Sequence, residues 1–283
     1  MSSLPVSSIH SLPSESVADS ARRFAGIDRV YGPGALARAL AAHVVVVGIG
    51  GVGSWAAEAL ARSGVGRITL IDLDHVAISN INRQVHALEA TLGAAKVLAM
   101  AARIAEINPA CQVVTIEEFI DETNVGGLIP ACDAVIDAID NVRAKAALIA
   151  HCRQQGIRIL TTGGAGGRLD PTQIQVVDLS RTTQDALASK VRARLRKGYG
   201  FSRDPKKKFG VECVFSPEQI RRPAGAPVQD NAVNENICVT DTAGADLDGS
   251  AGLACAGYGS SVAVTAGFGF AAAAKVLAGI LST

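Results

Sequence analysis

The sequence contains no pair of cysteines at Cys-x-x-Cys spacing, although six cysteines occur in its 283 residues. The six stand apart from one another, at Cys111, Cys132, Cys152, Cys213, Cys238 and Cys255. A structural zinc site and a disulfide framework both need paired or clustered cysteines, so neither is indicated. Isolated thiols fit a protein of the reducing cytoplasm.

Residues 1–20 lack the features of a secretory signal. They are rich in serine but have no positively charged start and no continuous apolar run. We expect a disordered leader there and no export. Near the other end, residues 251–274 carry no charged side chain. Because Gly and Ala dominate this stretch and Lys275 interrupts its end, we expect a buried pair of helical turns and a helix, and no stable membrane insertion.

The chain also has almost no net charge, but its charges are unevenly distributed. The formal net charge is +1, whereas residues 181–208, the basic segment, contain ten Lys or Arg against Asp185 and Asp204. The basic segment therefore carries +8 and leaves −7 for the rest of the chain. Such a concentration suits a polyanion, because each cation that neutralises a phosphate releases a condensed counterion. The alternative interpretation is a solvated, mobile loop.

Apolar residues make up 48% of the chain, and β-branched runs alternate with segments of helical apolar spacing. Strands are expected at His43–Val47, Arg67–Asp72, Cys111–Ile116, Asp133–Ala138 and Ile157–Thr162. Helices are expected at Ser54–Arg62, Ala94–Ile107 and Val142–Gln155. This alternation predicts an α/β fold with a Rossmann-like, doubly wound and mostly parallel sheet, whose ligands bind at the carboxyl ends of the strands.

After residue 170 the pattern changes, so we expect a Rossmann-like domain over residues 21–180 and an elaborated C-terminal portion over 181–283. Further strands are expected at Gln173–Asp178 and Val211–Phe215. Beyond the basic segment, residues 222–250 form a polar stretch, and residues 254–281 are rich in small side chains and predict a helix.

The glycine motif Gly48-x-Gly50-x-x-Gly53 follows the first expected strand and opens the first expected helix. This arrangement directs backbone N–H groups and a helix dipole at a phosphate chain. A nicotinamide-dependent dehydrogenase has the same loop and an acid after its second strand, where this chain has Asp72. The loop alone therefore leaves a dehydrogenase and an ATP-using enzyme open.

Polar and charged residues downstream of Asp72 distinguish an ATP-using enzyme from a dehydrogenase. They are Asp74, Asn80, Arg83, Gln84, Lys96, Asp137, Asp140 and Asn141. A nicotinamide site has little use for two cations and an extra acid around a phosphate chain. Adenylation of a carboxylate uses all three, because cations offset the charge of the phosphates and of the leaving pyrophosphate while an acid holds Mg²⁺.

In this order the motifs resemble the nucleotide site of the ThiF/MoeB/HesA branch of the ubiquitin-activating superfamily, over roughly residues 22–178. The resemblance implies ATP and Mg²⁺ as cofactors. The nucleotide would be bound by Gly48, Gly50, Gly51, Gly53, Asp72, Asp74, Asn80, Arg83, Gln84, Lys96, Asp140 and Asn141. Asp72 would bind the ribose, Asp140 would coordinate Mg²⁺, and Arg83, Lys96 and Asp140 would act in catalysis. Arg29 resembles the arginine that family members insert into a partner subunit's site, which implies a homodimer.

Within this superfamily, many enzymes that activate sulfur-carrier proteins have two Cys-x-x-Cys pairs, which this chain lacks. Its sequence is more similar to bacterial tRNA-modifying dehydratases. The supporting strings are Arg23–Phe24, Arg29–Gly32, Gly48–Arg62, Thr161–Gly167, Asp170–Gln175, Cys213–Ser216 and Phe268–Phe270. The similarity implies a tRNA substrate carrying N6-threonylcarbamoyladenosine, whose threonyl carboxylate is adenylated before the carbamoyl group closes a five-membered ring.

Because nucleophile and electrophile belong to one side chain of that nucleoside, ring closure needs no enzymic nucleophile. Cys213 and Cys255 are candidates for a sulfur relay with a protein partner, and buried structural thiols are the alternative. On this reading the basic segment binds tRNA phosphates through Lys190, Arg192, Arg194, Arg196, Lys197, Lys206, Lys207 and Lys208. The alternatives are activation of a sulfur-carrier protein, a dehydrogenase and a non-catalytic nucleotide-binding scaffold. A monovalent cation is a further candidate ligand that the sequence does not locate.

Overall fold

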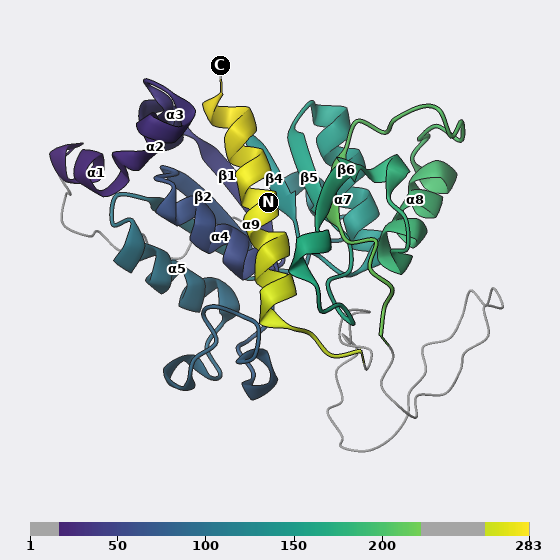
Figure 1. Ribbon diagram of the computed structural model, residues 1–283, viewed down its shortest axis with the longest axis horizontal. Coiled ribbons are helices and arrows are strands. Elements are labelled where there is room, and N and C mark those ends of the chain that lie inside the picture. The colour runs from purple at the N-terminus through teal and green to yellow at the C-terminus, as the bar shows by residue number, and fades with distance from the viewer. Residues whose placement is uncertain (1–16, 222–257, 283) are drawn as a thin grey trace, which may run out of the picture.

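The computed structural model describes residues 17–221 and 258–282, which form a seven-stranded sheet with helices on both faces (Figure 1). The strands are β1 (His43–Val47), β2 (Arg67–Ile71), β3 (Gln112–Ile116), β4 (Ala134–Asp137), β5 (Arg158–Thr162), β6 (Gln175–Asp178) and β7 (Glu212–Phe215). The α-helices are α1 (Val17–Phe24), α2 (Gly26–Tyr31), α3 (Ala35–Ala41), α4 (Gly53–Arg62), α5 (Lys96–Ile107), α6 (Val125–Leu128), α7 (Val142–Gln155), α8 (Ala186–Gly198) and α9 (Val262–Leu281). Short 3-10 helices are η1 (Ile78–Asn80), η2 (Glu89–Thr91), η3 (Pro171–Gln173) and η4 (Leu179–Arg181).

The strands lie in the order β3-β2-β1-β4-β5-β7-β6. Each neighbouring pair is parallel except β6 and β7, which are antiparallel. The order of the strands reverses between β1 and β4, and in such sheets ligands bind beyond the carboxyl ends at this switch point. The predicted α/β fold with a mostly parallel, doubly wound sheet is confirmed, and the expected strands end within two residues of the observed bounds.

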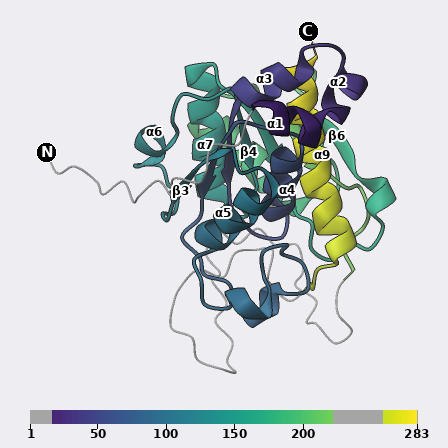
Figure 2. The same ribbon diagram turned by 90° about the vertical axis from the view of Figure 1, so that its left-hand side faces the viewer.

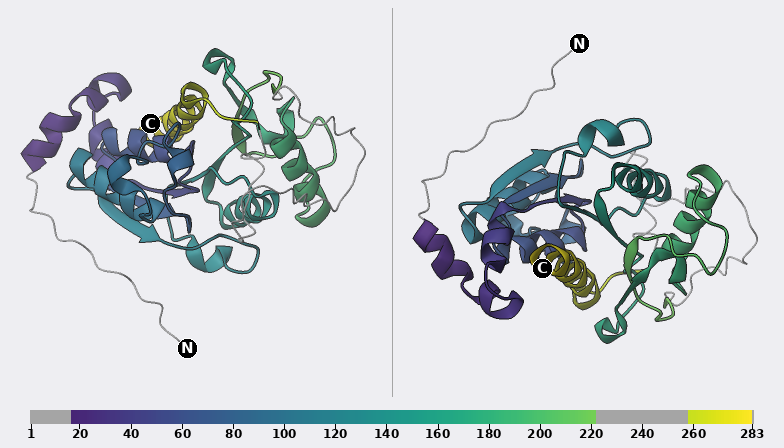
Figure 3. Two further views of the ribbon diagram at one scale, coloured as in Figure 1. Left: turned by 90° about the horizontal axis from the view of Figure 1, so that it is seen from below. Right: turned by 90° about the horizontal axis from the view of Figure 1, so that it is seen from above.

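Helices cover both faces of the sheet, and successive side chains along a strand point to opposite faces, so neighbouring residues join different apolar clusters. On β1, Val44 and Val46 join one apolar cluster together with residues of α4, α5 and α9, whereas Val45 and Val47 join a second cluster with residues of α7 and α8. Figure 3 shows the consequence, with α9 and α7 on opposite faces of the sheet. The four successive valines of β1 are explained by its place in the interior of the sheet, where both of its faces are covered.

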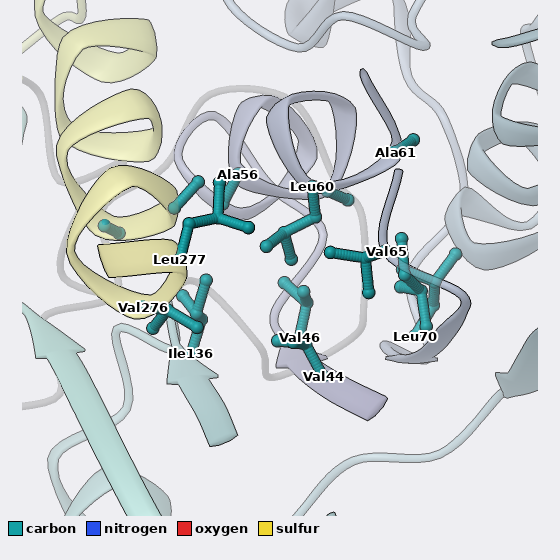
Figure 4. Packing of buried hydrophobic residues seen from close by; sticks show 14 of the residues in the cluster. Val44, Val46, Ala56, Leu60, Ala61, Val65, Leu70, Ile136, Val276 and Leu277 are labelled. Atoms are coloured by element: carbon teal, nitrogen blue, oxygen red, sulfur yellow. The ribbon is translucent and has the colours of Figure 1, made fainter. Parts of the chain in front are cut away.

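Helix α9 completes the core beside α4. Val276 and Leu277 pack among Ala56, Leu60 and other residues of the first cluster (Figure 4). The two helices approach closely at Gly269, where a Cβ atom would lie 2.5 Å from the Val52 carbonyl oxygen. Among the described residues α9 is the one helix long and apolar enough to span a membrane, and it packs as the core helix predicted from the sequence. It begins at Val262, later than predicted, and residues 254–257 of the prediction lie outside the described residues.

The basic segment and the chain after it belong to the same sheet as the preceding residues. β7 pairs with β5 and β6, and α8 covers the face that α7 also covers. The interpretation of the basic segment as a solvated, mobile loop is wrong for residues 186–198, which are helical. The expected disordered leader is likewise too long by four residues, since α1 begins at Val17, and residues 1–16 and 222–250 lie outside the described residues.

Candidate nucleotide-binding and active site

The glycine loop between β1 and α4 lies at the switch point of the sheet. Gly48 has a φ of +85°, and a Cβ there would lie 2.9 Å from the Ala138 carbonyl group at the end of β4. A Cβ at Gly53 would lie 1.8 Å from the Gly48 carbonyl oxygen. Around Gly50, in contrast, a Cβ would meet no atom within 4 Å. The loop is packed tightly on its inner side and open at Gly50, where a ligand can approach the backbone.

The amino end of α4 carries no side-chain cap, because Val52 occupies the N-cap position. No capping side chain in the described part of the chain therefore offsets the dipole of α4 at the open side of the loop, which suits a phosphate. Gly51 borders this space between Arg83 and α9, since a Cβ on Gly51 would lie 3.3 Å from Arg83 Cγ and 3.4 Å from Thr265 Cγ2.

Asp72, directly after β2, ties the glycine loop to the sheet. Its carboxylate accepts hydrogen bonds from Ile49 N at 2.6 Å and Asp74 N at 2.8 Å. Burial raises the pKa of Asp72, and the Lys96 charge and the two N–H groups oppose that rise. Each carboxylate oxygen has a further lone pair beyond these bonds, so Asp72 can also accept ribose hydroxyls.

Lys96, the first residue of α5, places its charge beside Asp74. Lys96 Nζ lies 2.7 Å from Asp74 Oδ2, and its side chain is 8% exposed against 46% for Asp74. The backbone repeats the contact, because Lys96 N donates to Asp74 O at 2.9 Å. A phosphate bound at Lys96 would therefore share the charge of the lysine with the Asp74 carboxylate.

Residues 80–84 form a turn that α4 holds in place. Asn80 Oδ1 accepts a hydrogen bond from Ala77 N, and Arg83 Nη1 donates to Ser79 O at 2.6 Å. Trp55 Nε1 donates to Arg83 O at 2.9 Å, so Trp55 positions the arginine from α4. Gln84 Oε1 is buried without a hydrogen-bond partner among the described residues. No local pattern signals the contact of Trp55 with Arg83, because the two residues are 28 positions apart.

At the carboxyl end of β4, two aspartates have different surroundings. Asp137 is fully buried, with Lys145 Nζ 2.9 Å from Oδ1 and the Thr161 hydroxyl donating to Oδ2 at 2.7 Å. Asp140 is partly exposed, and no hydrogen bond or ion pair with another described residue holds its side chain. Asn141 Oδ1 accepts from the N–H groups of Arg143 and Ala144, so Asn141 is the N-cap of α7. Asp140 is thus the carboxylate available to a ligand, and the buried cation Lys145 is a neighbour that sequence reasoning missed.

Arg29 lies on the exposed surface of α2, far from the glycine loop of its own chain. Leu36 N donates to Asp28 Oδ1, which fixes α2 on α3, and the Arg38 guanidinium on α3 donates to the Leu281 carbonyl at the end of α9. Thr265, beside Gly51, is near the other end of α9. At 1.5 Å per residue the sixteen steps between Thr265 and Leu281 span about 24 Å. Figure 2 shows α1, α2 and α3 grouped around the carboxyl end of α9.

The eight predicted tRNA-binding side chains divide into two sets. The three arginines contact other parts of the protein: Arg192 donates to the Thr182 hydroxyl, Arg194 pairs with Glu122, and the Arg196 guanidinium lies 5.2 Å from the centre of the Phe209 ring. The five lysines are exposed, namely Lys190, Lys197, Lys206, Lys207 and Lys208.

Asp178 orders the end of the basic segment. Its carboxylate accepts hydrogen bonds from the backbone N–H groups of Phe209, Gly210 and Val211 and from both the N–H and the hydroxyl of Ser180. Burial acts to raise the pKa of Asp178, but these hydrogen bonds outweigh it and hold the pKa below its ordinary value. The loop that carries Lys206 to Lys208 is therefore fixed to the end of β6.

The described cysteines do not form a nucleophilic site. Cys213 on β7 is fully buried, and burial raises its pKa far above neutrality. Burial also raises the pKa of Cys111 and Cys152 to about 12 and that of Cys132 to about 11. Cys213 is therefore a structural thiol, and Cys238 and Cys255 lie outside the described residues.

The chain is similar to known proteins over most of its length. The model of the ThiF family matches residues 22–282. The tRNA threonylcarbamoyladenosine dehydratase of Escherichia coli is 49% identical over 258 residues, which are 90% of this chain and 92% of that protein. The crystal structure of the Escherichia coli enzyme with ATP is similar with a TM-score of 0.79 at 46% identity, covering 92% of this chain and 94% of that one. The corresponding structure with AMP also has a TM-score of 0.79 at 46% identity, covering 94% and 98% of the two chains.

Proposed function

The chain belongs to the ThiF family, and from this premise we propose that it is an ATP-dependent tRNA threonylcarbamoyladenosine dehydratase. The observation that carries the proposal is the similarity to dehydratases of that name, which extends over nine tenths of both chains and includes structures bound to ATP and AMP. The reaction adenylates the carboxylate of N6-threonylcarbamoyladenosine in tRNA and releases pyrophosphate. Attack by the carbamoyl group then closes the ring and releases AMP, so the net change is a dehydration.

The site supplies groups suited to the first step. The open backbone at Gly50 and the uncapped end of α4 accept the phosphate chain, and Asp72 accepts the ribose hydroxyls. Arg83 borders Gly51, and Lys96 lies beside Asp74 and opposes the rise that burial causes in the pKa of Asp72, so the two cations can offset the charge that develops on the phosphates as pyrophosphate leaves. Asn80 holds the turn that carries Arg83, through its side-chain bond to Ala77 N and through its carbonyl, which accepts from Arg83 N and Gln84 N.

We assign the Mg²⁺ that would accompany ATP to Asp140. Its carboxylate has no partner among the described residues, and it follows β4 next to the glycine loop. The described residues contain no cluster of three or more His, Cys, Asp or Glu that would hold a metal alone. This donor set fits Mg²⁺, which proteins commonly hold through one or two carboxylates together with substrate phosphates. When bound, the ion would neutralise phosphate charge. We assign no ligands to a monovalent cation.

We propose that the basic segment binds the tRNA backbone. Its five exposed lysines provide the contacts, and the three arginines shape the surface by holding α8 against neighbouring elements. Phosphate contacts of this kind orient a polyanion without reading its bases. A tRNA substrate also agrees with a cytoplasmic enzyme.

We further propose that the enzyme works as a homodimer. Arg29 is exposed at the end of α9 opposite to the glycine loop, about 24 Å away along the helix. An arginine so placed can contact an ATP only in another copy of the chain. A sulfur-relay partner would have to use Cys238 or Cys255, because burial raises the pKa of all four described thiols and disfavours the reactive thiolate.

The test is the nucleoside profile of tRNA that carries N6-threonylcarbamoyladenosine, measured by mass spectrometry after incubation with the protein and ATP. We expect the nucleoside to lose the mass of one water, with one AMP formed per event. Exchange of labelled pyrophosphate into ATP with a Gly-Gly-ended carrier protein in place of tRNA would support the sulfur-carrier alternative. A nucleotide-binding scaffold would bind ATP and catalyse neither reaction, and a dehydrogenase would bind a nicotinamide cofactor instead.

A further inference from the structure

Asp185 joins the first turn of α8 to the loop after β5, residues 163–168. Its Oδ1 accepts a hydrogen bond from Ala188 N at 2.9 Å, which caps α8. Its Oδ2 accepts from Gly164 N at 3.0 Å, and Arg168 Nη2 lies 3.4 Å from the same oxygen. The side chains of Asp185 and Arg168 are 1% and 0% exposed. One carboxylate therefore fixes two segments to each other inside the protein.

Arg168 strengthens this connection from the other side. Its guanidinium donates to the carbonyl oxygens of Gly164 and Gln184 and lies 5.9 Å from the centre of the Phe268 ring. Gln184 has a φ of +53°, a left-handed conformation that costs a non-glycine residue free energy and persists only where neighbours hold it. The bond from Arg168 to the Gln184 carbonyl provides such support.

Gly163 shows how closely the loop and α8 approach. A Cβ on Gly163 would lie 2.1 Å from Asp185 Oδ2, so any larger residue would displace the carboxylate. The loop at 163–168 and the amino end of α8 are therefore in direct contact and cannot shift independently.

The same loop is continuous with the nucleotide site in two directions. The Thr161 hydroxyl on β5 donates to Asp137, three residues before Asp140. Phe268, on which Arg168 stacks, follows Thr265 on α9 by three residues, and Thr265 borders Gly51. Side-chain contacts and short stretches of backbone thus connect Asp185 with both the expected Mg²⁺ ligand Asp140 and the glycine loop.

We propose that Asp185 and Arg168 are positioning residues, which set the basic helix α8 at a fixed place relative to the nucleotide so that the tRNA-borne carboxylate meets ATP in register. This inference rests on the proposed function. The physical reason is that stability alone does not favour a buried ion pair, because a well-packed apolar pair would serve as well or better. The Arg168 guanidinium, however, satisfies two carbonyl oxygens and one carboxylate at once, which an apolar side chain cannot do.

The test uses the full-length double variant D185N/R168M, which removes both charges together and keeps an N-cap of good propensity on α8. We expect the dissociation constants of ATP and tRNA to stay within about twofold of wild type, because neither the glycine loop nor the exposed lysines change. We expect kcat for the cyclic nucleoside to fall at least tenfold, because misplacement of bound reactants acts on the chemical step. R168K, which keeps the charge, should recover part of that kcat.

A matched control is E58Q/R103M, which removes another buried carboxylate, on α4, and one of its two arginine partners, on α5, and leaves the exposed Arg62 in place. This control should leave kcat within twofold of wild type even where it lowers the melting temperature. If folded D185N/R168M turns over at the wild-type rate, if R168K loses as much kcat as the double variant, or if the control loses as much kcat, the positioning role is wrong. Absence of cyclic nucleoside with the wild-type enzyme would instead overturn the proposed function, and this inference with it.

Discussion

Replacement of Lys145 by methionine should destabilise the protein far more than the loss of an ordinary lysine. Lys145 Nζ is 2.9 Å from Asp137 Oδ1, and the two side chains are 2% and 0% exposed. In K145M the methionine fills much of the same volume, but the Asp137 carboxylate loses its cation. Removing one partner of a buried ion pair typically costs 3–5 kcal/mol. Because the Thr161 hydroxyl and Ile139 N still donate to Asp137, we expect the lower end, about 3 kcal/mol.

The measurement is urea unfolding followed by circular dichroism, with the free energy extrapolated to water. The double variant D137N/K145M removes both charges and should recover stability to within about 1.5 kcal/mol of wild type. Lys190, which is exposed on α8, supplies the control, and K190M should change stability by no more than about 0.5 kcal/mol. A loss below about 1 kcal/mol for K145M, or a double variant as unstable as the single one, would refute a buried charged pair at this position.

Three further results are expected. In G53A the added methyl group would lie 1.8 Å from the Gly48 carbonyl oxygen, so the loop must shift and ATP affinity should fall at least tenfold by calorimetry. The triple variant K190E/K197E/K207E should bind tRNA more weakly and with a flatter dependence on salt, because each lost phosphate contact lowers the slope of log K against log salt by about 0.7–0.9. D178N should cost about 1–3 kcal/mol at pH 7. Since the pKa of Asp178 is held down in the folded protein, that difference is fully present above about pH 4 and is lost as the pH falls through the folded-state pKa.

Each of these has a control or a contrary result. G127A adds its methyl group where no atom lies within 4 Å, so it should leave ATP affinity unchanged. R67E reverses an exposed charge at the amino end of β2, away from the basic segment, and should not alter the salt slope of tRNA binding. A D178N variant whose stability deficit persists undiminished at pH 2 would show that the Asp178 charge is not what orders residues 209–211.

The sheet could be predicted from the sequence because its signals are local. The run His43–Val47 has β-branched residues at four successive buried positions, and the glycines at 48 and 53 follow it where backbone crowding excludes a Cβ. Helix α8 also had a local signal, since Leu187, Val191 and Leu195 recur every four residues after the N-cap Asp185. The high content of Lys and Arg suggests a solvated loop despite this apolar spacing, because charge indicates exposure to solvent but does not indicate backbone conformation.

The pairings within the candidate site could not be predicted in the same way. Lys96 with Asp74, Lys145 with Asp137 and Trp55 with Arg83 each depend on which strands become neighbours. A sequence gives the kinds of residues and their order, whereas the strand order of the sheet determines which polar side chains come within contact distance of one another. The buried environment that protonates Cys213 is likewise a property of β7 between β5 and β6.

The packing of α9 on α4 affects how the protein folds. This contact joins residues 53–62 with residues 262–281, so forming it closes a loop of about two hundred residues. The entropy of closure grows only slowly with loop length, but the rate of folding falls as contacts become more distant in sequence. Until residue 281 has been synthesised, α4 and the β1 residues Val44 and Val46 lack the cover that α9 provides, and Gly51 has no Thr265 beside it. The nucleotide loop is therefore among the earliest segments to leave the ribosome and among the last to be completed, which makes the nascent chain a candidate for chaperone binding during that interval.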